Sequence, residues 1–238
     1  MKIALVGYGK MGKTIEKIAT ERGHDVVLKL NETPKHYQLT DNGVDAAIEF
    51  TNPEVAYQNI VQLLQSNVPV VSGTTGWDKD LKKVYELVEK YNGSFIHATN
   101  FSLGVNLFFE IIKKCMLIMN DYPAYGLSLE EVHHTEKKDS PSGTAISMAE
   151  NLMEISDYKT WHLTSEEEVK ENSIPITAMR KAEVKGTHIL QFKSAIDSIE
   201  LKHEAYSRDG FALGAVMAAE YIFEKNGIFT MKDVLNLK

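Results

Sequence analysis

Near its start the chain reads Ile3-Ala4-Leu5-Val6-Gly7-Tyr8-Gly9-Lys10-Met11-Gly12. Its first four residues form a short apolar run that ends at a glycine, the pattern of a buried parallel strand. Residues 13–22 carry apolar side chains at helical spacing and are followed by Gly23, and residues 25–30 form a second apolar run. Strand, glycine turn, helix and strand within about 30 residues have the size of one βαβ unit.

The alternation of strand and helix continues to about residue 104. The next predicted elements are strands at 46–50, 68–72 and 94–98 and helices at 53–64 and 78–91. Either Thr51 or Asn52 could cap the first of these helices, because Pro53 suits a first helical position. The alternation predicts an α/β fold with a Rossmann-like, doubly wound and mostly parallel sheet.

The pattern changes after residue 104. We expect helices at 105–119, 142–155 and 211–223, a strand at 126–134, two antiparallel strands at 188–192 and 198–203, and a short element at 229–234. Residues 164–172 are polar and acidic and are expected to form a surface excursion. The chain therefore divides into a dinucleotide-binding domain at 1–104 plus 208–238 and an inserted α+β domain at 105–207.

The composition excludes several classes of protein. The 238 residues include 26 Lys and Arg against 33 Asp and Glu, a net charge of −7, whereas nucleic-acid phosphates need a basic face. The single cysteine, Cys115, excludes an internal disulfide and a metal site held by cysteines alone. No apolar run reaches the roughly 18 residues of a membrane helix, and the N-terminal apolar run is too short for a signal peptide. We therefore expect a cytoplasmic protein. Its ligands would be small molecules rather than nucleic acid or membrane.

The glycine turn predicts a dinucleotide cofactor. Gly7 permits the tight turn, Gly9 lets the backbone approach a pyrophosphate, and Gly12 allows close packing of helix on strand. The helix that follows offers N–H groups and partial positive charge to the phosphates. A glycine turn of purely structural use is the alternative.

The choice between NADH and NADPH stays open. Dinucleotide folds usually place an acidic residue after the second strand to bind the adenosine ribose. In this chain Asn31 and Glu32 stand there, while Lys10, Lys13 and Lys35 lie where they could meet a 2′-phosphate. Each lysine could equally be a solvated surface charge.

Two further loops directly follow predicted strands: Gly73-Thr74-Thr75-Gly76 and Asn100-Phe101-Ser102. Ligands of open α/β sheets bind outside the carboxyl ends of the strands. Small residues there would let a flat ring lie against the backbone, and Phe101 could pack against a nicotinamide. Ordinary turn chemistry is the alternative for both loops.

The densest polar cluster covers residues 131–144. The two histidines at 133 and 134 could exchange a proton near neutral pH, and Lys137 could neutralise a carboxylate or donate a proton. The run 142–144 precedes a predicted helix, whose N-terminus could bind an anion. Together these groups fit a small dicarboxylate, although a solvated loop before a capped helix would look alike. A metal site is less favoured, because adjacent residues on a strand point to opposite faces.

These residues resemble the bacterial dihydrodipicolinate reductases, now called 4-hydroxy-tetrahydrodipicolinate reductases. The longest match is Glu131-Val132-His133-His134-x-x-Lys137-x-Asp139-x-Pro141-Ser142-Gly143-Thr144-Ala145. The other matches, in the family's order, are the glycine turn, Phe50-Thr51 before a proline, Gly73-Thr74-Thr75-Gly76, Asn100-Phe101-Ser102-x-Gly104-Val105-Asn106, and Arg208 before Phe211-Ala212-x-Gly214-Ala215. The resemblance covers nearly the whole chain.

The resemblance implies an oxidoreductase that reduces a cyclic imine, the product of dihydrodipicolinate synthase, with NADH or NADPH. Tetrahydrodipicolinate would be the product, on the route to diaminopimelate and lysine. The implied catalytic pair is His133 and Lys137, and the implied substrate-binding residues are His134, Lys137, Ser142, Gly143 and Thr144. The implied cofactor-binding residues are Gly7, Tyr8, Gly9, Lys10, Met11, Gly12, Asn31, Glu32, Gly73, Thr74, Thr75, Ala98, Thr99, Asn100, Phe101, Arg208 and Phe211. A homotetramer built through the sheets of the second domain, and no metal, are also implied.

Two positions depart from the family pattern, and both concern the cofactor. The family's glycine turn often has one more residue and an arginine where Lys10 stands, and Asn31 occupies the place of the acid, with Glu32 next. Two other functions remain open: a two-domain dehydrogenase acting on an amino acid or aldehyde, and a non-catalytic NAD(H) sensor that binds a protein partner. A sensor has no need for the 133–144 cluster and would bind cofactor without turnover.

Overall fold

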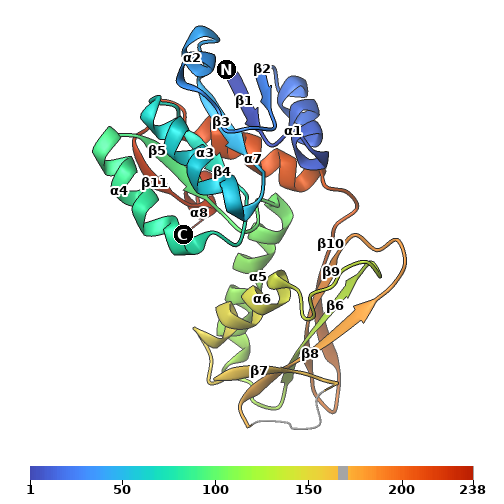
Figure 1. Cartoon of the computed structure of the whole chain (residues 1–238). Helices are drawn as coiled ribbons and strands as arrows, with labels where there is room; N and C mark the ends of the chain where they lie inside the picture. Colours follow the sequence, from blue (N-terminus) through green and yellow to red (C-terminus); the bar gives the residue numbers. More distant parts are fainter. Residues whose placement is uncertain (166–170, 238) are drawn as a thin grey trace. The chain divides into compact units, whose positions relative to one another are not determined.

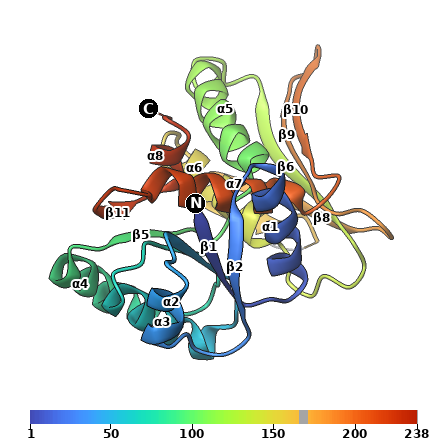
Figure 2. The same ribbon diagram turned by 90° about the horizontal axis from the view of Figure 1, so that it is seen from above.

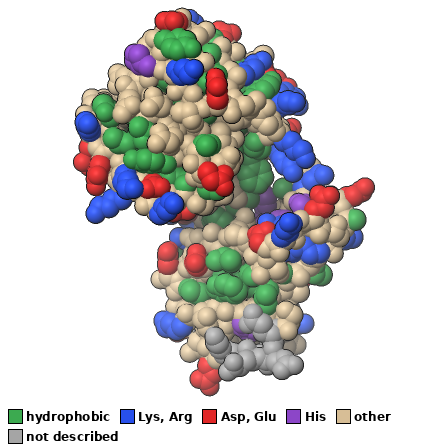
Figure 3. Space-filling model, viewed as in Figure 1, with side chains coloured by type: hydrophobic (Ala, Val, Ile, Leu, Met, Phe, Trp, Pro, Cys, Tyr) green, Lys and Arg blue, Asp and Glu red, His purple; other side chains and the backbone are tan. Residues whose placement is uncertain are grey.

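The computed structural model describes residues 1–165 and 171–237, which form two compact units (Figure 1). The first unit consists of Met1–Leu103 and Arg208–Lys238, and the second of Gly104–Ser207. Figure 3 shows acidic and basic side chains intermixed on the face that it displays. Among the described residues, no helix combines the length and the apolar character needed to span a membrane.

The sheet of the first unit is parallel throughout its described strands. These are β1 (Lys2–Val6), β2 (Asp25–Leu30), β3 (Ala46–Glu49), β4 (Val70–Ser72), β5 (Ser94–His97) and β11 (Gly227–Phe229), in the order β11-β5-β4-β3-β1-β2. Strand β2 lies on one side of β1 in the sheet and β3 lies on the other, so the strand order reverses direction at β1. The prediction of a doubly wound parallel sheet is confirmed, with its switch point at the carboxyl ends of β1 and β3.

Helices cover both faces of this sheet. They are α1 (Lys10–Glu21), α2 (His36–Asp41), α3 (Pro53–Gln65), α4 (Leu81–Tyr91), α7 (Asp209–Ile222) and α8 (Met231–Val234), with a 3₁₀ turn at Asp78–Asp80. Figure 2 shows α1 and α7 on one side and α2, α3 and α4 on the other. Along β1, Ile3 and Leu5 pack with the first group, and Ala4 and Val6 with the second. Coverage on both faces explains the continuous apolar runs of these strands.

The second unit is a mixed sheet with two helices on one face. The described elements are β6 (Gly126–His133), β7 (Thr160–Leu163), β8 (Ser173–Arg180), β9 (Thr187–Lys193), β10 (Ser198–Glu204), α5 (Leu103–Met119) and α6 (Gly143–Met153). Their order in the sheet is β10-β9-β6-β8-β7, with β6, β8 and β7 mutually parallel and the rest antiparallel. Side chains of α5 and α6, such as Ile112 and Leu152, form one core with Ile176 and Phe192 of the sheet. The inserted α+β unit is therefore confirmed.

Several elements differ from the sequence prediction. Helix α2 and strands β7 and β8 were not predicted; β8 contains Pro175, which weakens a strand pattern. The single element expected at 229–234 is instead strand β11 followed by α8. Residues 78–80 form a 3₁₀ turn ahead of α4, and Ser142 caps α6 rather than lying within it. Of the surface excursion expected at 164–172, residues 166–170 lie outside the described residues.

Candidate active site

The glycine turn of the first unit leaves space for a ligand. Gly7 has a φ of 97°, and a Cβ there would lie 1.9 Å from the carbonyl oxygen of Phe50. A Cβ on Gly12 would lie 2.4 Å from the Gly7 oxygen, whereas one on Gly9 would meet no described atom within 4 Å. Helix α1 begins at Lys10, and its first N–H groups donate to no capping side chain in the described structure. Open amides at a helix N-terminus suit a phosphate.

Asn31 is tied to the glycine turn. Its Oδ1 accepts a hydrogen bond from the backbone N–H of Tyr8 at 2.8 Å. A cavity of about 310 Å³ lies beside it, lined by Gly7, Asn31, Glu32, Thr33, Thr51, Asn52, Val55 and Asn59. Lys10, Lys13 and Lys35 are all exposed. This cavity lies at the switch point of the sheet, where this fold binds ligands.

Glu49 is fully buried at the end of β3, and it was not among the residues predicted from the sequence. Its carboxylate accepts hydrogen bonds from the hydroxyls of Thr51, of Ser72 at 2.7 Å, and of Thr74 at 2.8 Å. The carbonyl of Thr74 in turn accepts a hydrogen bond from Trp77 Nε1 at 2.7 Å. Glu49 therefore fixes the start of the loop at 73–76. The available signal was one acidic residue in the otherwise apolar run at 46–50.

The ring of Phe101 belongs to the core of the first unit. It is 2% exposed and packs against Phe50, with ring centroids 5.9 Å apart. Phe50 also covers Gly73, where a Cβ would lie 2.1 Å from its ring. What the loop at 98–101 can offer a ligand is therefore its backbone and its polar side chains, because the ring of Phe101 is already packed.

The other predicted cofactor residues lie in the same unit. Thr75, Thr99 and Arg208 are exposed, whereas Tyr8, Met11, Ala98, Asn100 and Phe211 are half-buried. Arg208 directly precedes α7, and its carbonyl accepts a hydrogen bond from the N–H of Phe211 at 3.1 Å. The positions of these residues are compatible with a ligand at the carboxyl ends of the strands, and their roles remain predictions.

In the second unit, three side chains from two neighbouring strands converge. Glu131 and His133 point to the same face of β6, and Glu131 lies opposite His188 in the register of β6 with β9. His133 Nε2 is 3.3 Å from His188 Nε2 and 3.7 Å from Glu131 Oε2, and His188 Nε2 is 3.9 Å from the same oxygen. His188 was not predicted from the sequence, because strand register alone brings it to this point.

Glu131 connects this cluster to the start of α6. It is fully buried, and both of its oxygens lie 3.1 Å from the backbone N–H of Ser142, which donates to them. Arg180, at the end of β8, donates from Nη1 to Glu131 Oε1 at 3.2 Å. The Ser142 hydroxyl caps α6 by accepting from the Ala145 N–H at 3.1 Å. The N-terminus of α6 is thus held beside His133.

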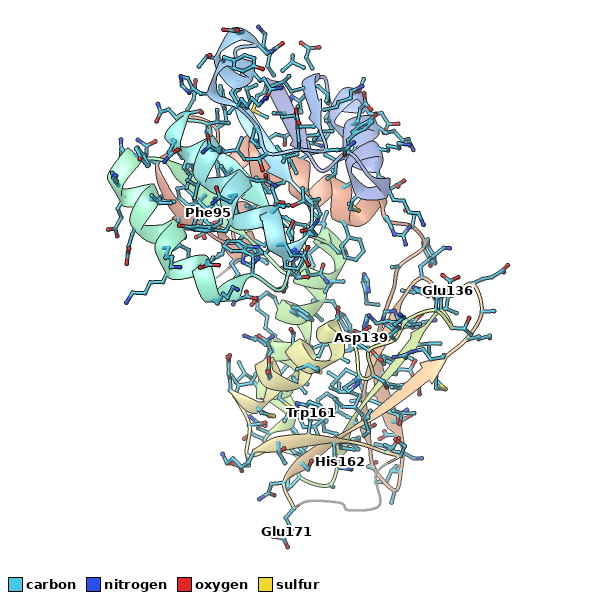
Figure 4. The ribbon with its side chains drawn as sticks, viewed as in Figure 1. Phe95, Glu136, Asp139, Trp161, His162 and Glu171 are labelled. Atoms are coloured by element: carbon cyan, nitrogen blue, oxygen red, sulfur yellow. The ribbon has the colours of Figure 1, made fainter. Side chains whose placement is uncertain are left out.

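The loop after β6 is held by Arg180. This side chain donates to the carbonyls of Lys137 at 3.4 Å and of Asp139 at 2.5 Å. Lys137 Nζ is 2.8 Å from Asp139 Oδ2, and this hydrogen bond lowers the pKa of Asp139. Figure 4 labels Glu136 and Asp139 in this loop. His134 is half-buried, and its Nδ1 has no hydrogen-bond partner in the described part of the chain.

The cluster keeps its histidines neutral. Burial above all, together with the proximity of His133, His203 and Lys137, lowers the pKa of His188 to about 3. Burial also lowers the pKa of His133; Glu131 opposes this shift, whereas Lys137, Arg180 and His134 add to it. A carboxylate bound here would counter these positive charges and raise the pKa of His133.

Glu131, His133 and His188 also have the spacing of metal ligands, with candidate ligand atoms within 4.8 Å of one another. Both Glu131 oxygens, however, already accept hydrogen bonds from Ser142 or Arg180. A second positive charge, on Lys137, faces His133 and would also repel a cation. The donor set therefore fits a hydrogen-bonded network rather than a metal site.

Comparison with known proteins gives the family. Residues 1–101 match the family described as "Dihydrodipicolinate reductase, N-terminus", and residues 104–235 match "Dihydrodipicolinate reductase, C-terminus". The chain belongs to the dihydrodipicolinate reductase family. It is accordingly an oxidoreductase, which sets aside the non-catalytic sensor.

Curated relatives and a solved structure agree with this family. A "4-hydroxy-tetrahydrodipicolinate reductase" of Christiangramia forsetii is 49% identical over 237 residues, covering 99% of this chain and 98% of that protein. One of Archaeoglobus fulgidus is 34% identical over 261 residues, covering 99% and 100%. The dipicolinate-bound dihydrodipicolinate reductase of Paenisporosarcina sp. TG-14 has the same fold, with a TM-score of 0.79, 22% identity, and coverage of 100% of this chain and 99% of that chain.

Proposed function

We propose that this dihydrodipicolinate reductase converts 4-hydroxy-tetrahydrodipicolinate to tetrahydrodipicolinate, using NADH or NADPH. The observation that carries the proposal is the cluster in which Glu131 links Arg180 to the capped N-terminus of α6, with Lys137 and Arg180 close enough to His133 to lower its pKa. Cationic groups beside a helix N-terminus attract a carboxylate, and the proposed substrate has two. The dipicolinate held by the solved structure from Paenisporosarcina is also a cyclic dicarboxylate.

The second unit would bind the substrate. We assign the carboxylates to Lys137, His134 and the start of α6, which consists of its cap Ser142 and its first residues Gly143 and Thr144. A Cβ on Gly143 would meet no described atom within 4 Å, so a ligand can approach the backbone there. Ser142 acts chiefly by capping the helix, since its hydroxyl already accepts from Ala145. The Glu131 carboxylate holds this turn in place from below.

The first unit would bind the dinucleotide. Its features fit such a ligand: the open space at Gly9, the uncapped N-terminus of α1, and the cavity beside Asn31 and Glu32. The loops at 73–75 and 98–101, with Arg208 and Phe211, would face the rest of the cofactor. When bound, NADH or NADPH supplies a hydride. Asn31 provides no carboxylate for the ribose, and exposed lysines lie nearby in sequence, so we expect NADPH to be accepted as well as NADH.

His133 and Lys137 would complete the chemistry. Replacing the 4-hydroxyl by hydrogen brings one hydride in and lets one hydroxide out, which leaves as water once it receives a proton. We assign that proton to His133 and the neutralisation of a carboxylate to Lys137. The carboxylates of the bound substrate raise the pKa of His133, so the acid form is loaded when substrate is present. General acid catalysis of this kind is typically worth about 10²–10⁴-fold.

A coupled assay tests the proposal. The substrate is made in situ by dihydrodipicolinate synthase from pyruvate and aspartate semialdehyde, and oxidation of NADH and NADPH is followed in parallel. We expect oxidation that depends on the synthase. Lys137→Ala should lower kcat/KM by about 10²-fold or more, since it removes a charge that meets the substrate, and leave cofactor affinity unchanged. The neighbouring exposed Lys138 gives the matched control, Lys138→Ala, which should keep full activity.

Oxidation that does not depend on the synthase would refute the proposed substrate, and loss of cofactor affinity in the Lys137 variant would refute the division of roles between the units.

We further propose a cytoplasmic homotetramer assembled through the sheets of the second unit. Helices α5 and α6 cover one face of that sheet, and Met179 of β8, which alternation along the strand places on the opposite face, is exposed. Light scattering should then give four times the chain mass of 26.7 kDa.

A further inference from the structure

The ring of His133 is confined in one orientation. Its Nε2 points inward, 3.3 Å from His188 Nε2, and the two rings meet edge-on with centroids 5.1 Å apart. A Cβ on Gly186 would lie 3.0 Å from Cε1 of His133. The glycine therefore leaves just enough room for the ring as it stands. Since Nε2 is used inside the unit, Nδ1 is the nitrogen left to meet a ligand.

In the acid form of His133, the N–H at Nε2 needs a hydrogen-bond acceptor. An imidazolium carries protons on both nitrogens, and a buried N–H needs an acceptor. The nearest Glu131 oxygen, at 3.7 Å, is beyond hydrogen-bond distance and already accepts from Ser142. His188 Nε2, at 3.3 Å, is the acceptor within reach in the described structure.

The surroundings of His188 allow its Nε2 to accept a hydrogen bond from His133 Nε2. His188 is 4% exposed, and its Nδ1 has no hydrogen-bond partner among the described residues. Burial above all, with His133, His203 and Lys137 nearby, disfavours a positive charge on His188, so the ring stays neutral. A neutral ring has one proton, and with that proton on Nδ1 the Nε2 atom is free to accept. The charge-assisted hydrogen bond from the His133 imidazolium, stronger than a neutral one, offsets the cost of an Nδ1–H with no acceptor among the described residues. The Ser142 hydroxyl, 3.4 Å from the same Nε2, is another donor within reach, and it lies farther away than His133 Nε2 at 3.3 Å.

We propose that His188 is a positioning residue that accepts the Nε2 proton of His133 and thereby reserves Nδ1 of His133 for proton delivery to the substrate. This inference rests on the proposed function, in which His133 is the acid. The proton on Nε2 stays in place throughout the cycle. Only the proton on Nδ1 is transferred, and it is replaced from solvent before the next turnover, so no other reactant is needed.

Two variants of His188 separate this role from packing. In His188→Gln the side-chain amide can still accept a hydrogen bond near the former Nε2, whereas His188→Met keeps the bulk and removes the acceptor. The matched control is His162→Gln. His162 is also a buried histidine of this unit, bonded to the Ser173 hydroxyl at 2.7 Å on β7, and Figure 4 shows it far from Asp139.

In the coupled assay, His188→Met should lower kcat by about 10–100-fold, part of the range for general acid catalysis, with the substrate KM within about twofold. His188→Gln should recover most of the activity, and the control should match the wild type. The pH profile of kcat should shift in His188→Met. All of the charged and titratable groups that face His133 jointly set its pKa and hold its proton on Nε2, so removing one of them changes the pKa. These groups are Glu131 on β6, His134 directly after this strand, Lys137 in the following loop, Arg180 on β8 and His188 on β9.

Nuclear magnetic resonance of ¹⁵N-labelled histidine locates the proton directly. In the wild type, Nε2 of His133 should stay protonated while Nδ1 titrates, and His188→Met should lose this asymmetry. Wild-type kcat and pH profile in His188→Met would overturn the proposal. So would equal losses in the Met and Gln variants, accompanied by a lower Tm, since that is a packing effect. Failure of the wild type to turn over the substrate would instead refute the proposed function, while the NMR titration would still decide the role of His188.

Discussion

The buried His188 predicts that the second unit loses stability in mild acid. Its pKa in the folded protein is about 3, whereas a histidine in an unfolded chain has a pKa of about 6.5. Between these values the unfolded chain binds a proton that the folded chain does not. The free energy of unfolding therefore falls as the pH drops from about 6.5 toward 3, and the stabilisation is fully present only above that range.

The magnitude follows from the same two values. Each pH unit inside the window costs about 1.4 kcal/mol for one proton, so lowering the pH from 7 to 5 should cost about 2 kcal/mol from His188 alone. Because its side chain is 5% exposed, solvent screening reduces this figure little. A loss of that size is a large fraction of the stability of an ordinary domain.

Urea unfolding at pH 7 and pH 5 measures this loss, followed by circular dichroism and by the fluorescence of Trp161 on β7. The wild type should lose about 2 kcal/mol more between the two pH values than His188→Gln, which has no titrating group at this position. Groups away from His188 titrate equally in both proteins and cancel in the difference, and the Gln side chain keeps an acceptor facing His133. Equal losses in the two proteins would refute the reasoning, because they would show that His188 is not held neutral by burial.

Two further predictions concern the first unit. Glu49→Gln should destabilise this unit by about 1–3 kcal/mol, because an amide N–H₂ would face hydroxyls that need an acceptor, and it should raise the KM for the cofactor. Urea unfolding measures the first effect and steady-state kinetics the second. An unchanged KM would contradict the role given to the loop at 73–76. Asn31→Asp keeps the acceptor for the Tyr8 N–H but adds a negative charge, so the ratio of NADPH to NADH rates should fall about tenfold. An unchanged ratio would place the 2′-phosphate away from Asn31.

The fold of the first unit follows from sequence patterns because each strand is short, apolar and directly followed by a turn. Both faces of its sheet are covered, so a continuous apolar run such as 3–6 leaves little ambiguity. The second unit was harder to predict. Strand β8 combines Pro175 with polar residues and lies between β6 and β7, and nothing local to its sequence indicates that position. Long-range strand pairing supplies what the local pattern lacks.

The candidate active site shows the same division. His133, Lys137 and Ser142 stand in one contiguous string, so their proximity could be expected from the sequence. His188 and Arg180 reach the same point only because β9 and β8 flank β6, with Glu131 opposite His188 and His133 opposite Arg180. A shift of one residue in either register would turn these side chains to the other face. The sequence contains both residues but does not state that register.

Two buried carboxylates, Glu49 and Glu131, do comparable work in the two units. Each is fully buried at or near the end of a strand, and each accepts hydrogen bonds from the segments that would meet a ligand. A buried carboxylate is stable only when several donors surround it. The hydrogen bonds that make the burial tolerable therefore also fix these donors in place. The donors are hydroxyls around Glu49, and the Ser142 N–H together with Arg180 around Glu131. Removing a donor leaves a buried charge short of partners, so mutations at such donors should impair ligand binding even where the donor never touches the ligand.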